Sequence, residues 1–341
     1  MHRRLPAEWE EQDGVLLAWP HSNTDWCGHL EAVQAVYLEI LQYITRFEHC
    51  LLVCPGAAEI SLRLKRAGIF MDRLHIHEVD TNDTWARDFG PITILENGSP
   101  LLLDFGFNGW GLKFPADLDN RITRELYLKG AFQGNPLKTV GLILEGGSIE
   151  SDGNGTILTT AECLLGPNRN PHLNRKEIEA ELGSLLGADY FLWLEHGFLE
   201  GDDTDSHVDT LARLCPDDTI LYTACDDPSD IHYDALRAMS EELKAFTTRK
   251  GAPYRLIPLP WPAPRFDAAG ARLPATYANF LVLNGAVLAP IYGDAADEAA
   301  LAAIRQAFPG RQVFGIDCSP LLLQHGSLHC VTMQLPKGAF L

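Results

Sequence analysis

Strand-like and helix-like segments alternate along the whole chain, and this alternation limits the fold more than any other feature of the sequence. Short apolar runs at 15–19 and 50–55 are typical of buried strands, and the apolar residues of 30–47 recur with helical spacing. A second helix is expected at 57–68, where Gly68 suits the position that follows a helix end. The sequence therefore predicts strands and helices in the same domain.

Two hairpins interrupt the helices. The first is expected at 92–107, around Asn97-Gly98, and the second at 142–165, with its turn at 152–155. The remaining expected elements are helices at 117–130, 174–186, 230–249 and 295–307, strands at 74–80, 189–194, 219–223, 254–258, 279–283, 286–289, 312–316 and 329–335, and an extended segment at 205–214.

About five helices are thus bracketed by pairs of strands, in blocks of roughly 68 residues. Such blocks are long for a solenoid repeat and suit a ring of α/β units. Five prolines fall within 253–264, which predicts a stiff, extended loop. We interpret this loop as the rim of a binding site, with a linker between domains as the alternative.

The chain is strongly acidic. Its 46 Asp and Glu residues outnumber the 27 Lys and Arg residues, which gives a formal net charge of −19. Such a field repels nucleic acids and anionic membranes, so neither is expected as a partner. A small cationic ligand is favoured, and acidity that serves only solubility is the alternative.

The eight cysteines are spread along the chain, and none forms a Cys-x2-Cys pair. This usage is typical of reduced thiols, and no apolar signal region or long uncharged apolar run is visible, so we expect a cytoplasmic protein. Cys50 and Cys54 flank an apolar run and are expected in the core, with a metal site as the alternative.

Two stretches place acids beside bulky residues or glycines. Trp85, Arg87 and Asp88 precede a Gly-Pro turn, a pattern that fits either a site or a solvated surface loop. Glu145 follows an apolar run and precedes two glycines, which allow a ligand or a neighbouring backbone to approach closely. An ordinary turn at a strand end is the alternative for Glu145.

A third stretch, 202–209, surrounds a histidine with acids. His207 and Asp209 share a face only if the segment is extended, because on a helix they diverge by about 200°. Carboxylates around a histidine raise its pKa and hold a cation, and a solvated acidic loop is the alternative.

The fourth stretch carries Cys330, which follows Gly326 and Ser327 and lies beside His329, with His325 nearby. Most cysteines are inert and buried, whereas a nucleophilic cysteine needs an ionised thiol and an acid/base histidine from elsewhere in the chain. The sequence assigns no role to His325 or His329.

A physical constraint links these stretches. Several carboxylates around one thiolate would raise the pKa of the thiol, unless a cation binds among them. A planar guanidinium resolves the conflict, because carboxylates bind its N–H edges while its charge favours the thiolate. Attack of a cysteine on the central guanidinium carbon is then the expected reaction.

Five motifs carry a resemblance to a known family: W-A-R-D-F-G-P at 85–91, L-E-G-G-S at 144–148, T-T-A-E-C-L-L at 159–165 with N-R-N-P at 168–171, D-T-D-S-H-V-D at 203–209, and G-S-L-H-C-V-T at 326–332. In this order, over about 245 residues, they closely resemble the agmatine deiminase family, which includes bacterial peptidyl-arginine-deiminase-like proteins. The resemblance implies the α/β pentein fold, a five-bladed propeller of ββαβ units with pseudo-fivefold symmetry, as one catalytic domain over 1–341.

The resemblance also implies catalytic roles. Cys330 looks like the nucleophile that attacks the guanidinium carbon and expels ammonia, leaving an S-alkylthiouronium intermediate. His207 resembles the general acid/base, which protonates the ammonia and then activates water. Glu145 matches the carboxylate that works with this histidine and contacts a guanidinium nitrogen. Asp88 and Asp209 match the pair that binds the guanidinium and sets its distance from the sulfur.

Two further residues are implied to bind substrate. Trp85 is similar to the aromatic residue that covers the aliphatic part of the substrate, and Asp203 stands where the family has an acid near the far amine. Arg87 is expected to support its loop rather than touch a cation.

The sequence departs from the family at two places beside the site. The family commonly has Gly-Gly-Asn/Gly-Ile-His-Cys and Thr-Asn-Gly-His, where this chain has 325–330 as H-G-S-L-H-C and 204–207 as T-D-S-H. These changes affect loop shape and substrate preference rather than the chemical groups.

The resemblance therefore predicts hydrolysis of agmatine to N-carbamoylputrescine and ammonia, a step of polyamine metabolism, with no metal or organic cofactor. A deiminase of free arginine or of a peptide's C-terminal arginine is the alternative, and a non-catalytic pentein binding module is a further one. A Mn-dependent agmatinase would need a second Asp/His cluster, which the sequence does not show. A homodimer or a higher homo-oligomer is implied.

Overall fold

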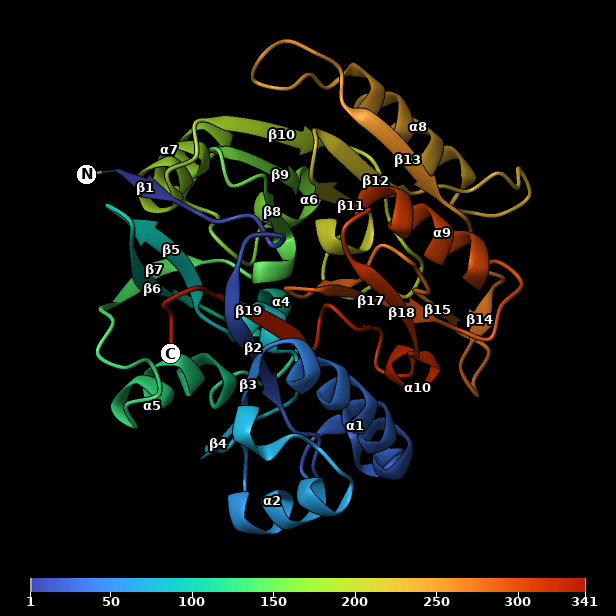
Figure 1. Cartoon of the computed structure of the whole chain (residues 1–341). Helices are drawn as coiled ribbons and strands as arrows, with labels where there is room; N and C mark the ends of the chain where they lie inside the picture. Colours follow the sequence, from blue (N-terminus) through green and yellow to red (C-terminus); the bar gives the residue numbers. More distant parts are fainter. Residues whose placement is uncertain (1, 341) are drawn as a thin grey trace.

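The computed structural model describes residues 2–340, whose strands form five sheets of three or four strands and one two-stranded ribbon, none of them closed on itself. Figure 1 shows α1 (Leu30–Phe47), α2 (Ala57–Arg66), α7 (Arg175–Leu186) and α8 (Tyr233–Ala245) on the outside of the molecule, with β8 (Ile149–Ser151) nearer its middle. Within 2–340, no helix has the length and apolar character needed to cross a bilayer.

One order of elements recurs in each of the five sheets: two antiparallel strands, a helix, and a strand parallel to the second. The helix supplies the crossover that a parallel pair requires. Four units follow one another along the chain: β5 (Ile92–Glu96), β6 (Ser99–Gly106), α5 (Ile122–Leu128), β7 (Leu137–Ile143); β8, β9 (Thr156–Thr160), α7, β10 (Tyr190–Leu194); β11 (Ala212–Cys215), β12 (Thr219–Thr223), α8, β13 (Arg255–Leu259); β16 (Leu281–Val282), β17 (Ala286–Ile291), α9 (Asp297–Ala307), β18 (Gln312–Asp317).

The fifth unit joins the two ends of the chain. The last strand, β19 (Thr332–Pro336), pairs antiparallel with β2 (Gln12–Ala18), and α1 then leads to β3 (His49–Cys54), parallel to β2. Helix α2 and β4 (Leu74–Glu78) extend the same sheet. Residues near 330 are thereby placed beside residues of the N-terminal segment.

Smaller elements complete the description: β1 (Arg3–Arg4) on β5, the ribbon of β14 (Arg265–Phe266) and β15 (Arg272–Leu273), and the short helices α3 (Ala86–Phe89), α4 (Gly109–Leu112), α6 (Ala161–Leu164) and α10 (Ser319–Leu322).

The clearest sequence patterns are confirmed. Helix α1 has the expected limits, and it buries Val33, Tyr37 and Ile40 at helical spacing. Asn97 (φ 52°) and Gly98 (φ 87°) form the expected hairpin turn, in which both central residues need a positive φ. Cys50 and Cys54 are buried in the core, as expected.

Two predicted helices are shorter than expected. The helix predicted at 117–130 begins with a 3₁₀ turn and is α-helical only in α5, because the Asn82 side chain accepts hydrogen bonds from the N–H groups of Leu118 and Asp119. The helix predicted at 230–249 is α8, and the chain then forms a bridge between Thr247 and Pro253.

The prediction of one extended segment at 205–214 is wrong for its first half. Asp205 (φ 64°) and Ser206 (φ 62°) are left-handed, a 3₁₀ turn follows at Val208–Thr210, and only β11 is extended. The Asp202 carboxylate accepts a hydrogen bond from the Ser206 N–H and thus stabilises this bend.

The strand predicted at 254–258 is confirmed, but the interpretation of 253–264 as the rim of a binding site is wrong. The first half of this segment is β13, an edge strand in which Pro258 lies opposite Tyr222, as proline tolerates at a sheet edge. Trp261 donates a hydrogen bond to Asp230 instead of approaching the central pocket, and no residue of 253–264 lines that pocket.

Candidate active site

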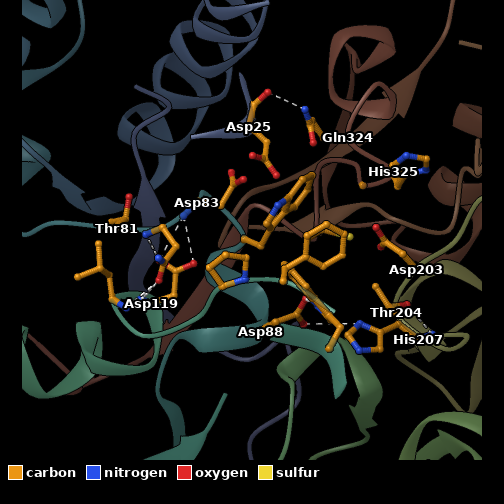
Figure 2. A pocket seen from close by; sticks show the side chains of 18 of the residues that line it. Asp25, Thr81, Asp83, Asp88, Asp119, Asp203, Thr204, His207, Gln324 and His325 are labelled. Atoms are coloured by element: carbon orange, nitrogen blue, oxygen red, sulfur yellow. Dashed lines mark hydrogen bonds and ion pairs between the residues drawn. The ribbon is translucent and has the colours of Figure 1, made fainter. Parts of the chain in front are cut away.

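A pocket of about 580 Å³ is lined by residues between His21 and Cys330, from segments far apart in the sequence. Figure 2 shows Thr81, Asp83 and Asp119 on one side of it and Asp203 and His325 on the other. Within 2–340 its lining includes three histidines but no lysine or arginine. Eight aspartates line it: Asp25, Asp80, Asp83, Asp88, Asp119, Asp202, Asp203 and Asp209.

The topology explains why the reactive end of this pocket draws on distant segments. Each of the five units places polar residues just before its first strand. These residues are Asp88 before β5, Glu145 to Gly147 before β8, His207 and Asp209 before β11, Asn279 before β16, and Cys330 before β19.

Asp88 is held by two uncharged donors. Its Oδ1 accepts a hydrogen bond from the Gly147 N–H (3.0 Å), and its Oδ2 accepts one from the Trp110 indole N–H (2.9 Å). Burial, and next the charge of Asp209, raise the pKa of Asp88 well above its ordinary value. In the free pocket Asp88 therefore ionises less readily than an exposed aspartate does.

Trp110 reaches Asp88 from a left-handed turn. All four residues of α4 have positive φ, including the two non-glycines Trp110 (φ 55°) and Leu112 (φ 70°). Such backbone costs energy for residues with a side chain, and it is concentrated at functional sites. The next residue, Lys113, donates to Asp205 (2.6 Å) and to the Asp203 carbonyl (2.7 Å), which ties this turn to the opposite wall.

Asp209 is held by a histidine instead. Its Oδ2 accepts a hydrogen bond from His329 Nδ1 (2.8 Å), whereas its buried Oδ1 has no partner within the described chain. Burial alone would raise the pKa of Asp209, but the hydrogen bond and charge of His329 outweigh it and lower this pKa below its ordinary value. Asp209 is therefore ionised with one oxygen unused.

Cys330 lies between these carboxylates and Asn279. Its Sγ is 3.3 Å from Asn279 Oδ1, to which the thiol donates, and 3.9 Å from Asp209 Oδ2. Burial, followed by the charges of Asp209 and Asp88, raises the pKa of the Cys330 thiol well above its ordinary value. Without a cation in the pocket, this thiol stays protonated.

His207 lines the pocket with both ring nitrogens buried and without hydrogen-bond partners within the described chain. Its Nδ1 is 3.6 Å from Asp88 Oδ1, the contact drawn in Figure 2. Burial lowers the pKa of His207 to about 3, so its ring is neutral and free to accept a proton. The bent backbone described above brings His207 and Asp209 to one pocket without the extended segment that was expected.

Gly147 allows these groups to converge. A Cβ at this position would lie 2.6 Å from His207 Nδ1, 2.9 Å from Asp88 Oδ1 and 3.1 Å from Asp209 Oδ2. Any larger residue would displace at least one of the three side chains.

Glu145 is the predicted site residue that does not line the pocket. It is fully buried, and both of its oxygens accept hydrogen bonds from Arg169 Nε (2.9 and 3.0 Å). A carboxylate oxygen of Glu145 lies within 4.8 Å of a His207 ring nitrogen. Glu145 therefore lies behind the pocket wall and beside the histidine, and its contact with a guanidinium nitrogen stays a prediction.

The two predicted substrate-binding residues both line the pocket. Trp85 packs against Gly326, where a Cβ would lie 2.1 Å from the indole ring. Burial, and next the charge of Asp202, raise the pKa of Asp203 to about 6. Arg87 does not line the pocket and pairs with Glu8 (2.9 Å), which agrees with a supporting role.

Two triads within residues 2–340 have donor atoms close enough to be considered as metal sites: Glu145 with Cys163 and His207, and Glu8 with Glu150 and His329. Every carboxylate oxygen of these triads already accepts a hydrogen bond from an N–H group, chiefly of Arg169, Arg87 and Arg213. The nearby guanidiniums also repel a cation, so neither triad is built to hold a metal.

Sequence reasoning missed three residues of the site. Trp110 lies in the glycine-rich stretch 107–115, to which the sequence assigned no role. Arg169 lies in the N-R-N-P motif at 168–171, also without an assigned role. Asn279 accepts the Cys330 thiol and the backbone N–H of His329 (2.8 Å). Its position before the first strand of a unit, shared with the other site residues, is the signal that could have revealed it.

Comparisons with known proteins place this geometry in a family. The sequence profile of the Porphyromonas-type peptidyl-arginine deiminases matches residues 4–336. An agmatine deiminase of Ectopseudomonas mendocina is 34% identical over 98% of this chain and 96% of its own length.

Two solved structures are similar over nearly their whole length. One from Porphyromonas gingivalis, provisionally named an arginine deiminase, has 48% identity and a TM-score of 0.93, covering 99% of this chain and 100% of that one. A cysteine-to-serine variant of C. jejuni agmatine deiminase with substrate bound has 40% identity and a TM-score of 0.92, covering 98% and 97%.

Proposed function

The chain belongs to the Porphyromonas-type peptidyl-arginine deiminase family and has the α/β pentein fold, and from this premise we propose that its acidic pocket hydrolyses the guanidinium group of agmatine to N-carbamoylputrescine and ammonia. The relatives named as agmatine deiminases, one of them solved with its substrate, support this activity.

The observation that carries the choice of substrate is the charge of the pocket lining. Its eight aspartates complement a dication such as agmatine, which has a guanidinium at one end and an ammonium at the other. Arginine bears an α-carboxylate, which needs a cationic partner, and no lysine or arginine lines the pocket within 2–340. The lining therefore favours the amine over the amino acid.

The first half-reaction begins when the guanidinium enters between Asp88 and Asp209. Its positive charge offsets the carboxylates that keep the Cys330 thiol protonated, so the thiol transfers its proton to neutral His207 and becomes a thiolate. The thiolate attacks the guanidinium carbon, His207 returns the proton to one nitrogen, and the C–N bond breaks to release ammonia. An S-alkylthiouronium on Cys330 remains.

The second half-reaction reverses these proton movements. His207 removes a proton from water, and the hydroxide adds to the thiouronium carbon. The C–S bond then breaks to release N-carbamoylputrescine, whose hydroxyl proton passes to solvent and is taken up by the ammonia. His207 returns its proton to the Cys330 thiolate, which restores the starting thiol. Glu145, close to the His207 ring, stabilises the protonated form of this histidine in both halves.

At the far end, we assign Trp85 to the aliphatic chain of the substrate and Asp203 to its ammonium group. Both residues line the pocket. An ammonium group beside Asp203 would favour the ionised form of this carboxylate.

We further propose that residues 1–341 form one catalytic domain whose five ββαβ units are arranged as a propeller with pseudo-fivefold symmetry. The recurrence of the unit and the pairing of β19 with β2 support this arrangement. The reaction as written uses no metal or organic cofactor. The eight free thiols are typical of a reducing compartment such as the cytoplasm, and a homo-oligomer follows from the family resemblance alone.

The test is ammonia release by the purified protein from agmatine, free arginine and a peptide ending in arginine, with and without a chelator. We expect kcat/KM for agmatine to exceed the other two at least tenfold, chelator to have no effect, and Cys330→Ala to abolish turnover. A preference for arginine or its peptide would support the second candidate, which the name of the matching family favours.

A further inference from the structure

A buried ionic network lies beneath Asp209, on the side away from the pocket. Glu8, from the N-terminal segment, places Oε1 2.8 Å from His329 Nε2, while the other ring nitrogen of His329 donates to Asp209. Glu8 also accepts hydrogen bonds from Arg87 (2.9 Å) and Arg213 (2.8 Å). His329 is thus placed between two carboxylates.

The network contains one more acid than base. Its carboxylates belong to Glu8, Glu150 and Asp209, and its guanidiniums to Arg87 and Arg213. An uncompensated charge in such a buried cluster is costly, so one further proton is required for neutrality. That proton resides on a carboxyl group or on His329.

Two groups compete for the proton. Burial raises the pKa of Glu150 to about 8, and burial together with Arg213 and Arg87 lowers the pKa of His329, against the opposing charge of Glu8. Both shifts favour the proton on Glu150, so the case for His329 rests on the hydrogen-bond geometry.

The geometry favours the histidine. Both oxygens of Glu150 face N–H donors, since one accepts from Arg213 Nε and the other from the Leu214 N–H (3.1 Å). A protonated carboxyl would direct its O–H against one of them. By contrast, each ring nitrogen of His329 lies 2.8 Å from a carboxylate oxygen, which only accepts. Arg213 Nη2 lies 3.0 Å from Nε2 as well, but the shorter contact of this nitrogen is with Glu8.

We propose that Glu8 is a positioning residue for the reaction: it holds His329 in the doubly protonated form, and His329 in turn holds Asp209 as a carboxylate with Oδ1 directed to the substrate. The expected effect on turnover rests on the proposed function, whereas the protonation state of His329 does not. Glu8 touches no substrate, because it does not line the pocket, and it acts only through His329.

The groups that face His329 are all included in this account. Asp209 and Glu8 face its nitrogens, Arg213 Nη2 lies 3.0 Å from Nε2, Arg87 lies on the far side of Glu8, and Cys330 is its neighbour in the chain. A carboxylate oxygen of Glu150 also lies within 4.8 Å of a His329 ring nitrogen. Glu8, Asp209 and Glu150 favour the second proton, and of these Glu8 and Asp209 contact the ring nitrogens at 2.8 Å. Removing the charge of Glu8 leaves two carboxylates and two guanidiniums, so the cluster is neutral without the second proton of His329, and that proton is released.

The state of His329 is measured directly by NMR of the ligand-free protein with ¹⁵N-labelled histidine, assigned with the His329→Gln variant. We expect both ring nitrogens to be protonated at pH 7 in the wild type and only one in Glu8→Gln. A singly protonated His329 in the wild type would overturn the proposal, and so would identical spectra in the two proteins. The protonation state of His329 in the wild type is thus measured without turnover and without the Glu8→Gln variant.

Kinetics supply the second readout. Loss of the imidazolium raises the pKa of Asp209, so the acid limb of kcat/KM for agmatine should move to higher pH by about one unit in Glu8→Gln. Glu11→Gln is the matched control, because Glu11 is an exposed acid of the same segment, paired only with Lys337. An unshifted limb in Glu8→Gln would contradict the proposal, whereas a wild type that does not turn over agmatine would contradict the proposed function and leave the NMR result standing.

Discussion

Asp88 and Asp209 are both buried at the reactive end of the pocket, with 4% and 0% of their surface exposed. Their hydrogen-bond donors nevertheless differ, and their pKa values shift in opposite directions. Asp88 receives two uncharged N–H groups, from Trp110 and Gly147. Asp209 receives an N–H of His329, which belongs to the charged network that contains Glu8. The pKa of Asp88 is raised and the pKa of Asp209 is lowered.

The difference shows that burial alone does not decide which carboxylate is ionised. The charge of the donors decides it, because uncharged donors offset only part of the desolvation of a carboxylate. We infer a division of labour, in which Asp209 is charged before the substrate arrives and Asp88 becomes charged when the guanidinium binds. The variants that follow alter one carboxylate or one of its donors at a time.

The largest effect is expected from Asp209→Asn. This change removes the charge that awaits the guanidinium and leaves the buried His329 without its acceptor, so kcat/KM should fall by about a thousandfold, or about 4 kcal/mol. Asp88→Asn should cost about a hundredfold, because its donors are uncharged and tolerate an amide oxygen. Ammonia-release rates test the order, and a larger loss for Asp88→Asn would refute the division of labour.

Gly147→Ala disturbs both carboxylates at once. The added Cβ would lie within 3.1 Å of His207, Asp88 and Asp209 atoms, so we expect kcat to fall by about a hundredfold while the protein stays folded. Gly141→Ala is the matched control, because a Cβ there meets nothing within 4 Å. Equal activities of the two variants would show that the convergence at Gly147 is unimportant.

Substrate binding should release a proton from Asp88. With Cys330→Ser to prevent turnover, calorimetry in buffers of different ionisation enthalpy should show about one proton released per agmatine bound near neutral pH. Since the bound form favours ionised Asp88, affinity should rise with pH by up to about tenfold per unit. In the Asp88→Asn background the release should disappear, and its persistence would assign the proton elsewhere.

The smallest effect is expected from Trp110→Phe, which removes only the indole N–H bound to Asp88. One lost hydrogen bond of this kind costs about 1 kcal/mol, or about fivefold in kcat/KM. Trp193→Phe is the control, because its indole N–H also binds a carboxylate, Glu179, away from the pocket. If both variants match the wild type, Trp110 does not hold Asp88 for the reaction.

Much of the fold could be predicted because hydrophobic periodicity and turn chemistry act locally. The limits of α1 and the Asn97-Gly98 hairpin follow from residues within each element. The bend at Asp205 and Ser206 could not be predicted, because it depends on a hydrogen bond from the Ser206 N–H to Asp202 and on ion pairs of Asp205 with Lys113 and Arg169. The strand β13 was predicted, but the segment 253–264 was misjudged as the rim of a site because its place at a sheet edge is a property of the assembled sheet.

The predicted pocket residues could be named because each belongs to a motif, and their roles remain predictions. Their supports could not be named, since Trp110 contacts Asp88 only through an improbable left-handed turn. Glu8 and Arg213 likewise meet His329 only because the two chain ends pair as β19 and β2 and because β11 lies beside them. Motif reasoning named the groups that we expect to react, whereas the network around them required the fold.

The most direct test of the account is the capture of the covalent intermediate. Wild-type protein is mixed with agmatine, quenched in acid during turnover and digested, and the peptides are analysed by mass spectrometry. The account predicts that the peptide containing Cys330 gains the mass of agmatine less ammonia, and that this adduct vanishes when the substrate is exhausted. Steady turnover without an adduct, or an adduct on Cys163 instead, would contradict it.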